Sequence, residues 1–343
     1  MMSQLSYYKG DVILVDSLQG LSYIPMQHMP FGVAESGRFV ILTSENYQSR
    51  ALVRVDMAGK EDPLGLPEMD YEELRVSPLG TSVAVEVNRY EGRGDQIVIA
   101  QLDGADSIRR LTFESSNYEP AWSADGSQII FPSERFGRTS ASFYVRNEDG
   151  SGTAESVTPN APINIGYPDW SRDGDLIAFS EDNWGPDGSF VGVYSIKADS
   201  VIRILREPGT GYAYPRISPN GRYLVYRRSF QGSSQLWVTE IAGTVSRPVV
   251  TNGGNMPVWS PNGETLYFER SNGIFAVDIE TEGALRVVGF ERQLYMSETS
   301  FYFDVLPDNS GFILAKSRGE VDQGIVTVID NFDEVLRREV TSN

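Results

Sequence analysis

A chain of 343 residues with 47 acidic and 29 basic side chains carries a formal net charge of −18. That charge repels phosphate backbones, and the densest basic runs are only Arg pairs, so we expect no nucleic-acid partner. No apolar run reaches the roughly 18 residues of a membrane span, so we also expect no direct membrane insertion. The absence of cysteine excludes disulfides, thiolate metal sites and cysteine nucleophiles.

Two short apolar segments stand near the start of the chain. They are DVILVDS from residue 11 and GLSYIP from residue 20, and both are typical of strands. Residues 1–30 lack the basic and apolar pattern of a signal peptide. Neither segment belongs to the repeat that follows, so each is available to complete another part of the fold.

A unit with a spacing of 42 to 48 residues occurs seven times along the rest of the chain. Each copy has a short strand ending in a bulky apolar residue, a tight turn and a second strand, as in PAWSADGSQIIF from residue 120. The last turn position requires a positive φ, which Gly tolerates and Asn adopts more readily than most residues. The residues at this position are Gly37, Gly80, Gly126, Gly174, Gly221, Gly263 and Asn309.

The second strand of each copy is apolar on both faces, which fits sheets stacked face to face. A third strand follows, such as QIVIAQLD from residue 96, and a weaker fourth is visible in most copies, such as RRLT from residue 109. Four antiparallel strands at this period form the blade of a β-propeller. We expect the Trp of PAWS and its equivalents to pack between blades.

The seventh copy lacks a fourth strand. The segment NFDEVLRREV from residue 331 is typical of a helix, with Asn331 as N-cap and Glu334 as its capping-box partner. An N-terminal strand would complete this blade and remove two exposed edges. The sequence therefore predicts an all-β fold in one domain, residues 1–343. It is a seven-bladed β-propeller of four-stranded antiparallel blades, closed by an N-terminal strand, with a short C-terminal helix.

The units resemble the WD40-like propeller repeats of TolB and its relatives, with their Pro-x-Trp-Ser-Pro-Asp-Gly signature. PVWSPNGETLYFER from residue 257 is among the best matches, and the resemblance covers nearly the whole chain. EPAWSADGSQIIFPSERFG and the terminal VIDNFDEVL look like propellers beyond a membrane span in bacterial receptor-type serine/threonine kinases and winged-helix regulators. This resemblance implies an extracytoplasmic, periplasmic sensing or protein-binding module; without a visible signal peptide, a cytoplasmic location stays open.

Two columns of equivalent positions point to the central channel of the ring. The column next to the bulky residue holds four charged residues: Arg75, Asp169, Arg216 and Asp304. A column two positions earlier holds Glu73, Glu119, Tyr167, Tyr214 and Tyr302. We predict a polar channel mouth rimmed by aromatics, suited to a peptide end or a small polar ligand. The alternative is that the charges pair with each other across the channel and only fill it.

The sequence offers little support for metal or cofactor chemistry. His28 is the single histidine, which excludes His-rich zinc or manganese sites. The Asp-Gly turns offer one carboxylate each, far short of the roughly 6–8 oxygens that calcium takes. We therefore expect no metal and no cofactor.

Three functions compete. The first is a monomeric, non-catalytic propeller that binds a protein or peptide at its channel mouth. The second is a carbohydrate-active hydrolase or lyase, in which Glu73, Glu119, Asp169 and Asp304 supply paired carboxylates. The third is a scaffold within a larger chain. The resemblance and the lack of a catalytic constellation favour the first.

Overall fold

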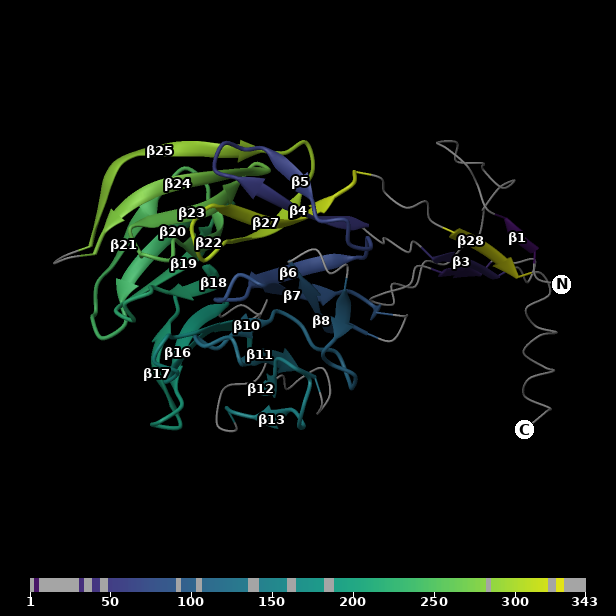
Figure 1. The fold of residues 1–343 in the computed structure, drawn as a ribbon, viewed down its shortest axis with the longest axis horizontal. Coiled ribbons are helices and arrows are strands. Elements are labelled where there is room, and N and C mark those ends of the chain that lie inside the picture. Colours follow the sequence, from purple (N-terminus) through teal and green to yellow (C-terminus); the bar gives the residue numbers. More distant parts are fainter. Residues whose placement is uncertain are drawn as a thin grey trace. The chain divides into compact units, whose positions relative to one another are not determined.

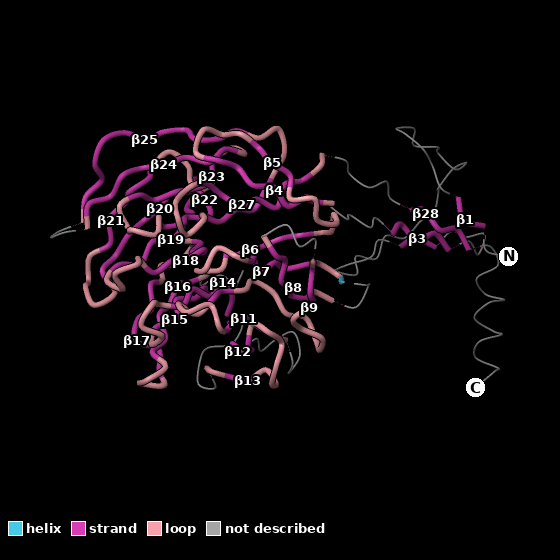
Figure 2. The backbone as a smooth tube through the Cα atoms, in the orientation of Figure 1, coloured by secondary structure: helices cyan, strands magenta, loops and turns pink. Residues whose placement is uncertain are grey.

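The computed structural model describes residues 3–5, 31–33, 39–43, 49–90, 94–102, 107–134, 142–158, 165–181, 188–281, 285–319 and 325–329. These residues form 28 strands and no α-helix, and the only helical position among them is a 3-10 residue, Tyr90. Strands and loops make up nearly all of the described chain (Figure 2). The chain divides into two compact units, Arg50–Arg318 and a smaller one of Met1–Ser49 with Gly319–Asn343. That the whole of residues 1–343 acts as one domain stays a prediction.

The larger unit is a propeller of six four-stranded antiparallel blades. Blades I to III are β6 (Tyr71–Val76), β7 (Ser82–Val87), β8 (Gln96–Gln101), β9 (Ile108–Arg110); β10 (Ala121–Trp122), β11 (Gln128–Ser133), β12 (Ser142–Asn147), β13 (Glu155–Ser156); and β14 (Ile165–Trp170), β15 (Leu176–Glu181), β16 (Phe190–Ser195), β17 (Ser200–Leu205). Blades IV and V are β18 (Gly211–Ile217), β19 (Tyr223–Phe230), β20 (Ser233–Glu240), β21 (Ser246–Val250); and β22 (Asn255–Trp259), β23 (Thr265–Arg270), β24 (Gly273–Glu280), β25 (Arg286–Met296). Blade VI is β26 (Phe301–Val305), β27 (Gly311–Ser317), β4 (Arg50–Asp56), β5 (Glu61–Pro63). The innermost strands contact one another in sequence, and β26 contacts β6, which closes the ring.

The prediction of seven blades is therefore wrong. Six of the seven repeats begin a blade each, but the first repeat belongs to the smaller unit. Its strands β2 (Phe31–Val33) and β3 (Phe39–Thr43) join β28 (Ile325–Ile329) and β1 (Ser3–Leu5) in the order β1-β28-β3-β2. The repeat pattern specifies a hairpin, and a hairpin alone does not determine which strands will extend its sheet.

The ring is closed by residues 50–63 rather than by the earlier segments that the sequence favoured. β27 pairs with β4 and β4 pairs with β5, so strands from the two ends of the larger unit lie side by side (Figure 1). Gly311 allows this approach, because a Cβ there would lie 2.2 Å from the carbonyl oxygen of Val55. The segments at 11–17 and 20–25 lie outside the described residues. So does the C-terminal helix predicted from residue 331, and the described residues form no α-helix.

The core lies between the faces of neighbouring blades. Every residue of β7 and β16 is buried, as expected for strands that are covered on both sides. Trp122 packs in a cluster with Ile97 of blade I, and Trp259 packs with Tyr223 of blade IV. The prediction that tryptophans pack between blades is confirmed at these two positions.

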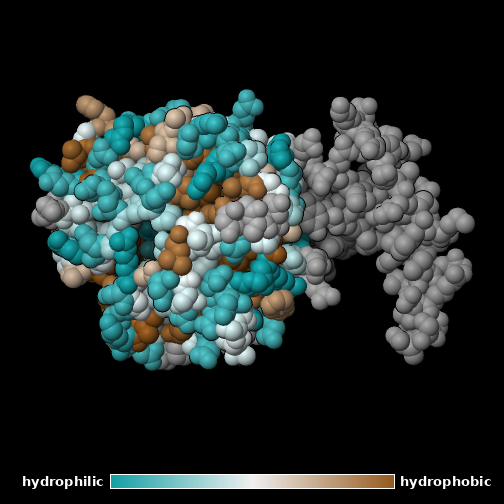
Figure 3. All heavy atoms as spheres, in the orientation of Figure 1, coloured by the Kyte–Doolittle hydropathy of each residue, from teal (hydrophilic) through white to brown (hydrophobic). Residues whose placement is uncertain are grey.

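The turns have the predicted backbone. φ is between 59° and 76° at Gly80, Gly126, Gly174, Gly221, Gly263 and Asn309, whereas Gly37 lies outside the described residues. The polar residue before the turn position acts locally, since Asp125 Oδ1 accepts the backbone N–H of Ser127 at 3.0 Å. The visible surface of the ring is mostly hydrophilic, with apolar residues in small scattered groups (Figure 3).

Candidate functional site

A cavity of about 530 Å³ lies on the axis of the ring, on the side of the Asp-Gly turns. All six innermost strands contribute to its wall. Each strand contributes the residue at the repeat position of the predicted charged column. These residues are Arg75, Ala121, Asp169, Arg216, Val258 and Asp304. Trp122, Trp170 and Trp259 also line it. The structure thus brings the four charged residues of that column together in one cavity.

The charged column has a twofold pattern that only a six-bladed ring creates. In ring order from blade VI the residues are Asp304, Arg75, Ala121, Asp169, Arg216 and Val258. Asp, Arg and an apolar residue therefore occur twice in succession. The two arginines come from blades three apart, on opposite sides of the axis, and so do the two aspartates.

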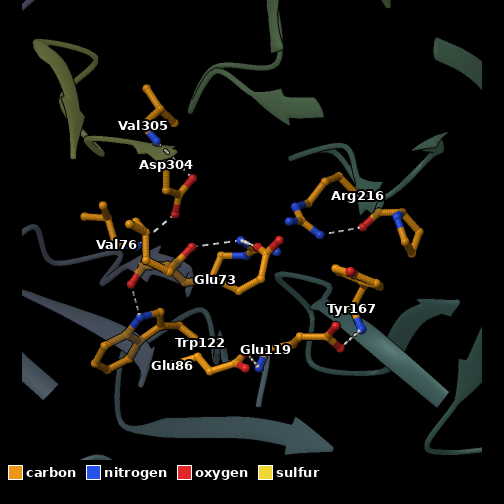
Figure 4. Close-up of polar contacts among 12 residues, drawn as sticks. Glu73, Val76, Glu86, Glu119, Trp122, Tyr167, Arg216, Asp304 and Val305 are labelled. Atoms are coloured by element: carbon orange, nitrogen blue, oxygen red, sulfur yellow. Dashed lines mark hydrogen bonds and ion pairs between the residues drawn. The ribbon is translucent and has the colours of Figure 1, made fainter. Parts of the chain in front are cut away.

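The side-chain carboxylate of each aspartate accepts a backbone N–H of the next blade and so joins two neighbouring blades. Asp304 Oδ2 accepts the N–H of Val76 at 2.8 Å, and its Oδ1 accepts the N–H of Val305 at 2.9 Å (Figure 4). Asp169 Oδ2 accepts the N–H of Ile217 at 2.7 Å. In the described residues, neither of these two carboxylates forms an ion pair with Arg75 or Arg216. The alternative in which the four charges pair with one another is therefore not what the structure shows.

The two arginines are buried but incompletely neutralised. Arg216 is 5% exposed and donates from Nη1 to the carbonyl oxygen of Pro215 at 2.9 Å. Among the described residues it has no ion-pair partner. Arg75 is 8% exposed, donates to the carbonyl oxygen of Leu74 and has Glu73 Oε2 at 3.5 Å from Nη1. Arg75 Nε is buried without a hydrogen-bond partner. Buried guanidinium groups need anionic or carbonyl partners, so this cavity is short of acceptors.

Burial changes the protonation of the aspartates. It raises the pKa of Asp169 to about 7, although the N–H of Ile217 and the charge of Arg75 act in the opposite direction. Burial also raises the pKa of Asp304, against the attraction of Arg75. Near neutral pH the cavity wall therefore carries less negative charge than its two aspartates suggest.

The raised pKa of Asp169 predicts a pH-dependent effect of Asp169→Asn on stability. From its ordinary value of 3.8 up to about 7, the folded state holds a proton that the unfolded state releases. Asp169 therefore destabilises the fold increasingly as pH rises through this window. We expect Asp169→Asn to gain at least about 1.4 kcal/mol in free energy of unfolding relative to wild type between pH 4 and pH 8, the value of one pKa unit. Urea titrations at several pH values measure it.

Asp173→Asn is the matched control in the same blade. Hydrogen bonds from Ser171 and from the backbone N–H of Asp175 lower the pKa of Asp173, so its substitution should act in the opposite direction with pH. If Asp169→Asn and wild type show parallel stability curves, the assigned pKa of Asp169 is wrong.

The second predicted column lies at a different level of the channel. Tyr214 and Tyr302, with Arg50, line a separate cavity of about 250 Å³. The rings of Tyr167 and Tyr214 lie 4.4 Å apart between centroids. Burial raises the pKa of all three tyrosines, so they remain neutral hydroxyl groups. Of the nine predicted site residues, four line the large cavity and two line the smaller one, so they do not share one rim. Glu73, Glu119 and Tyr167 line neither cavity.

Four blades hold this second column in left-handed backbone conformation. φ is 49° at Glu119, 50° at Tyr167, 53° at Tyr214 and 46° at Met256. Such values are uncommon for residues with a Cβ and persist only where the surroundings enforce them. At two of these positions the backbone N–H donates to a glutamate of the preceding blade. Tyr167 N–H donates to Glu119 Oε2 at 2.5 Å, and Glu119 N–H donates to Glu86 Oε2 at 2.9 Å (Figure 4).

The four carboxylates considered for hydrolase or lyase chemistry all have structural partners. Glu73 pairs with Arg75, Glu119 binds the backbone of Tyr167, and the two aspartates bind backbone N–H groups. Burial raises the pKa of Glu73. Glu119, Asp169 and Asp304 each link two neighbouring blades, whereas Glu73 and Arg75 lie in the same strand.

Two further charged residues, Arg172 and Glu86, were missed by the sequence analysis. Arg172, in the turn of blade III, lines the large cavity and donates to the carbonyl oxygen of Pro261 in blade V at 2.8 Å. Four copies have proline at the Arg172 position, so the departure from the repeat was a usable signal. Glu86 lies in a fully buried strand whose other residues are apolar except for Ser82, and burial raises its pKa well above the ordinary value.

Two other kinds of site are absent from the described residues. No group of three or more histidine or acidic side chains there is placed to hold a metal ion. No helix in the described part of the chain has the length and apolar character needed to cross a membrane.

Residues 74–263 match the family model of the TolB beta propeller domain, which is more than half of the chain. The chain belongs to the TolB β-propeller family. A protein TolB homolog from Chlorobium luteolum is 29% identical to this TolB-like chain over 199 residues, which are 56% of the chain and 42% of that relative. The chain thus spans less than half the length of this curated relative.

Solved structures share the fold of this TolB-like propeller at low identity. A candidate TolB from Agrobacterium tumefaciens aligns with a TM-score of 0.59 and 18% identity, covering 78% of this chain and 98% of that one. A hydrazine synthase chain from Kuenenia stuttgartiensis aligns with a TM-score of 0.56 and 14% identity, covering 95% and 99%. Because proteins of different function share this fold, the similarity supports the fold alone. The function has to be inferred from the residues of the site.

Proposed function

We propose that this TolB-like propeller is a non-catalytic module that binds a protein or peptide segment in the 530 Å³ cavity at the turn-side mouth of its channel. The observation that carries the proposal is the absence of ion pairs among Arg75, Asp169, Arg216 and Asp304 in the described residues. A channel that was only filled for stability would have its charges paired with each other. Instead the aspartates bind the backbone and the arginines face the cavity.

The cavity has the composition of a recognition site. Tryptophans, which are enriched where proteins bind partners, line it together with arginines. Its volume falls within the range of pockets that bind small ligands, so a few residues of a peptide would fill it. By its resemblance to propellers attached to receptor kinases and winged-helix regulators, we place this module outside the cytoplasm, as a monomer that senses or binds a protein.

Blocking the mouth tests the proposal. Ala124 is exposed in the turn of blade II and lines the cavity, so Ala124→Trp should obstruct the mouth without entering the core. Ala198→Trp is the matched control, because Ala198 is exposed in the turn between β16 and β17 and does not line the cavity. A random peptide library is panned against the immobilised full-length chain, and the enriched peptides are titrated against both variants.

We expect the enriched peptides to bind Ala124→Trp at least about tenfold more weakly than wild type, a loss of about 1.4 kcal/mol, and to bind Ala198→Trp unchanged. Peptides that bind both variants as well as wild type would show that another surface is used. Failure to enrich any peptide would also count against a peptide-binding mouth.

A further inference from the structure

Arg216 is a buried charge of the channel that has no ion-pair partner among the described residues. An arginine that is only 5% exposed normally has a carboxylate or several carbonyl acceptors for its guanidinium group. In this channel one contact to the carbonyl oxygen of Pro215 is present, and no ion pair joins Arg216 to any described residue. Its head group points into the channel toward the side of Glu73 (Figure 4).

Arg75 faces the same cavity from the opposite side of the ring. Its nearest carboxylate, Glu73 Oε2, is at 3.5 Å, and its Nε has no partner. Arg75 and Arg216 thus line one cavity whose aspartates accept the backbone N–H groups of Val76 and Ile217. An additional anion would satisfy donors on both sides.

The mouth above this pair is open on one flank. At three of the six turns, a Cβ built on the turn glycine would meet the proline of the preceding turn; for example, a Cβ on Gly263 would lie 3.3 Å from Pro219. Where the repeat has Ala or Arg172 instead of proline, the glycine of the next turn lacks this neighbour. No described atom lies within 4 Å of a Cβ built on Gly174 or Gly221. Open space therefore adjoins the turn glycines of blades III and IV.

Arg172 adds a third positive charge at this open flank. Its side chain is exposed and reaches across blade IV to the carbonyl oxygen of Pro261. An exposed arginine held by one carbonyl can turn toward an incoming anion at little cost. A negatively charged group that enters at this flank meets Arg172 first and the two buried arginines below.

We propose that Arg75 and Arg216 anchor a carboxylate of the bound peptide, with Arg172 at the mouth above them. Carboxylate is the favoured anion because the planar fork of a guanidinium matches its two oxygens. The carboxylate is either the C-terminus of the peptide or an Asp or Glu side chain. This inference rests on the proposed function and specifies the chemistry of its ligand.

Tryptophan fluorescence of the full-length chain provides the assay, since Trp122, Trp170 and Trp259 line the cavity. The probes are acetyl-Gly-Gly-Gly with a free carboxylate, the same peptide as an amide, acetyl-Gly-Asp-Gly-amide and digalacturonate. The variants are Arg216→Gln, Arg75→Gln and, as control, Arg222→Gln, an exposed arginine that pairs with Glu240 away from the cavity. Circular dichroism and the urea midpoint verify that each variant is folded.

We expect one or both carboxylate peptides to bind saturably and the neutral amide to bind at least about tenfold more weakly. Arg216→Gln and Arg75→Gln should each weaken the carboxylate peptide by a similar factor, whereas Arg222→Gln should not. Which peptide responds identifies the C-terminus or the side chain as the source. Arg216→Lys keeps the positive charge but lacks the planar guanidinium with its paired N–H donors. It should therefore bind the carboxylate peptide more tightly than Arg216→Gln and more weakly than wild type.

Several results would overturn the inference. One is equal binding of the free acid and the amide. A second is binding that Arg75→Gln and Arg216→Gln both leave intact. A third is binding of digalacturonate alone, which would make the ligand a carbohydrate. Library peptides that are blocked by Ala124→Trp but indifferent to both arginine substitutions would contradict the carboxylate anchor and leave the proposed function standing.

Discussion

Trp259→Ala should destabilise the propeller by about 3–5 kcal/mol. Trp259 is 6% exposed and packs in a cluster with Tyr223 and Leu266 between blades IV and V. Its indole Nε1–H also donates to the carbonyl oxygen of Arg216 at 3.2 Å, so the side chain connects two innermost strands. Trp259→Phe keeps most of the packing and should lose only the hydrogen bond, about 1 kcal/mol. Denaturant titration of each variant measures these differences.

Trp170→Ala is the matched control, because Trp170 occupies the equivalent position in blade III. Its indole donates to Gly174 in its own turn at 3.1 Å, and its side chain is only partly buried. We expect its loss to cost less than about 2 kcal/mol, since less apolar surface is buried there. Similar losses at the two positions would show that the connection between blades contributes little at Trp259.

Much of the structure of a single blade could be predicted from the sequence. The Pro-x-Trp and Asp-Gly segments contain the strand, the turn and the second strand within about twenty residues, so local rules suffice. Asn309 illustrates this, because its place in the repeat predicted a positive φ and the structure has 59° there. The packing of Trp122 between blades could also be predicted, because each repeat has one bulky apolar residue before its turn and Trp122 occupies that position in blade II.

The number of blades could not be read in the same way. The first repeat has the local pattern of a blade, yet β2 and β3 pair with β28 of the smaller unit. Pairing between strands far apart in sequence depends on the other strands available, which no single segment encodes. The left-handed conformation of Tyr167 and Tyr214 was also hidden, because a non-Gly residue carries no sign of a positive φ.

The blade count has a direct consequence for the site. In a ring of seven, Arg75 and Arg216 cannot face each other from opposite blades. In a ring of six they come from blades three apart, and the Asp-Arg-apolar order becomes twofold. The pairing of β4 with β27 that closes the ring is therefore the structural feature on which the channel and its ligand depend.

A cysteine pair across this junction tests the closure most directly. Ala51 of β4 lies opposite Lys316 of β27, and directly opposed residues are close enough for a disulfide. The natural chain has no cysteine, so Ala51→Cys with Lys316→Cys introduces the only two thiols. We predict that mild oxidation of the folded double variant links them within one chain. The link should stabilise the fold against urea by about 2–5 kcal/mol relative to the reduced form, because it closes a very long loop.

Peptide mapping by mass spectrometry, with each single-cysteine variant as control, identifies the linked residues. An intramolecular disulfide between positions 51 and 316, formed in most molecules and stabilising the fold, is the result that a six-bladed ring requires. Two thiols that stay unlinked in the folded protein would mean that other strands close the ring, and would contradict a channel in which Arg75 and Arg216 face each other.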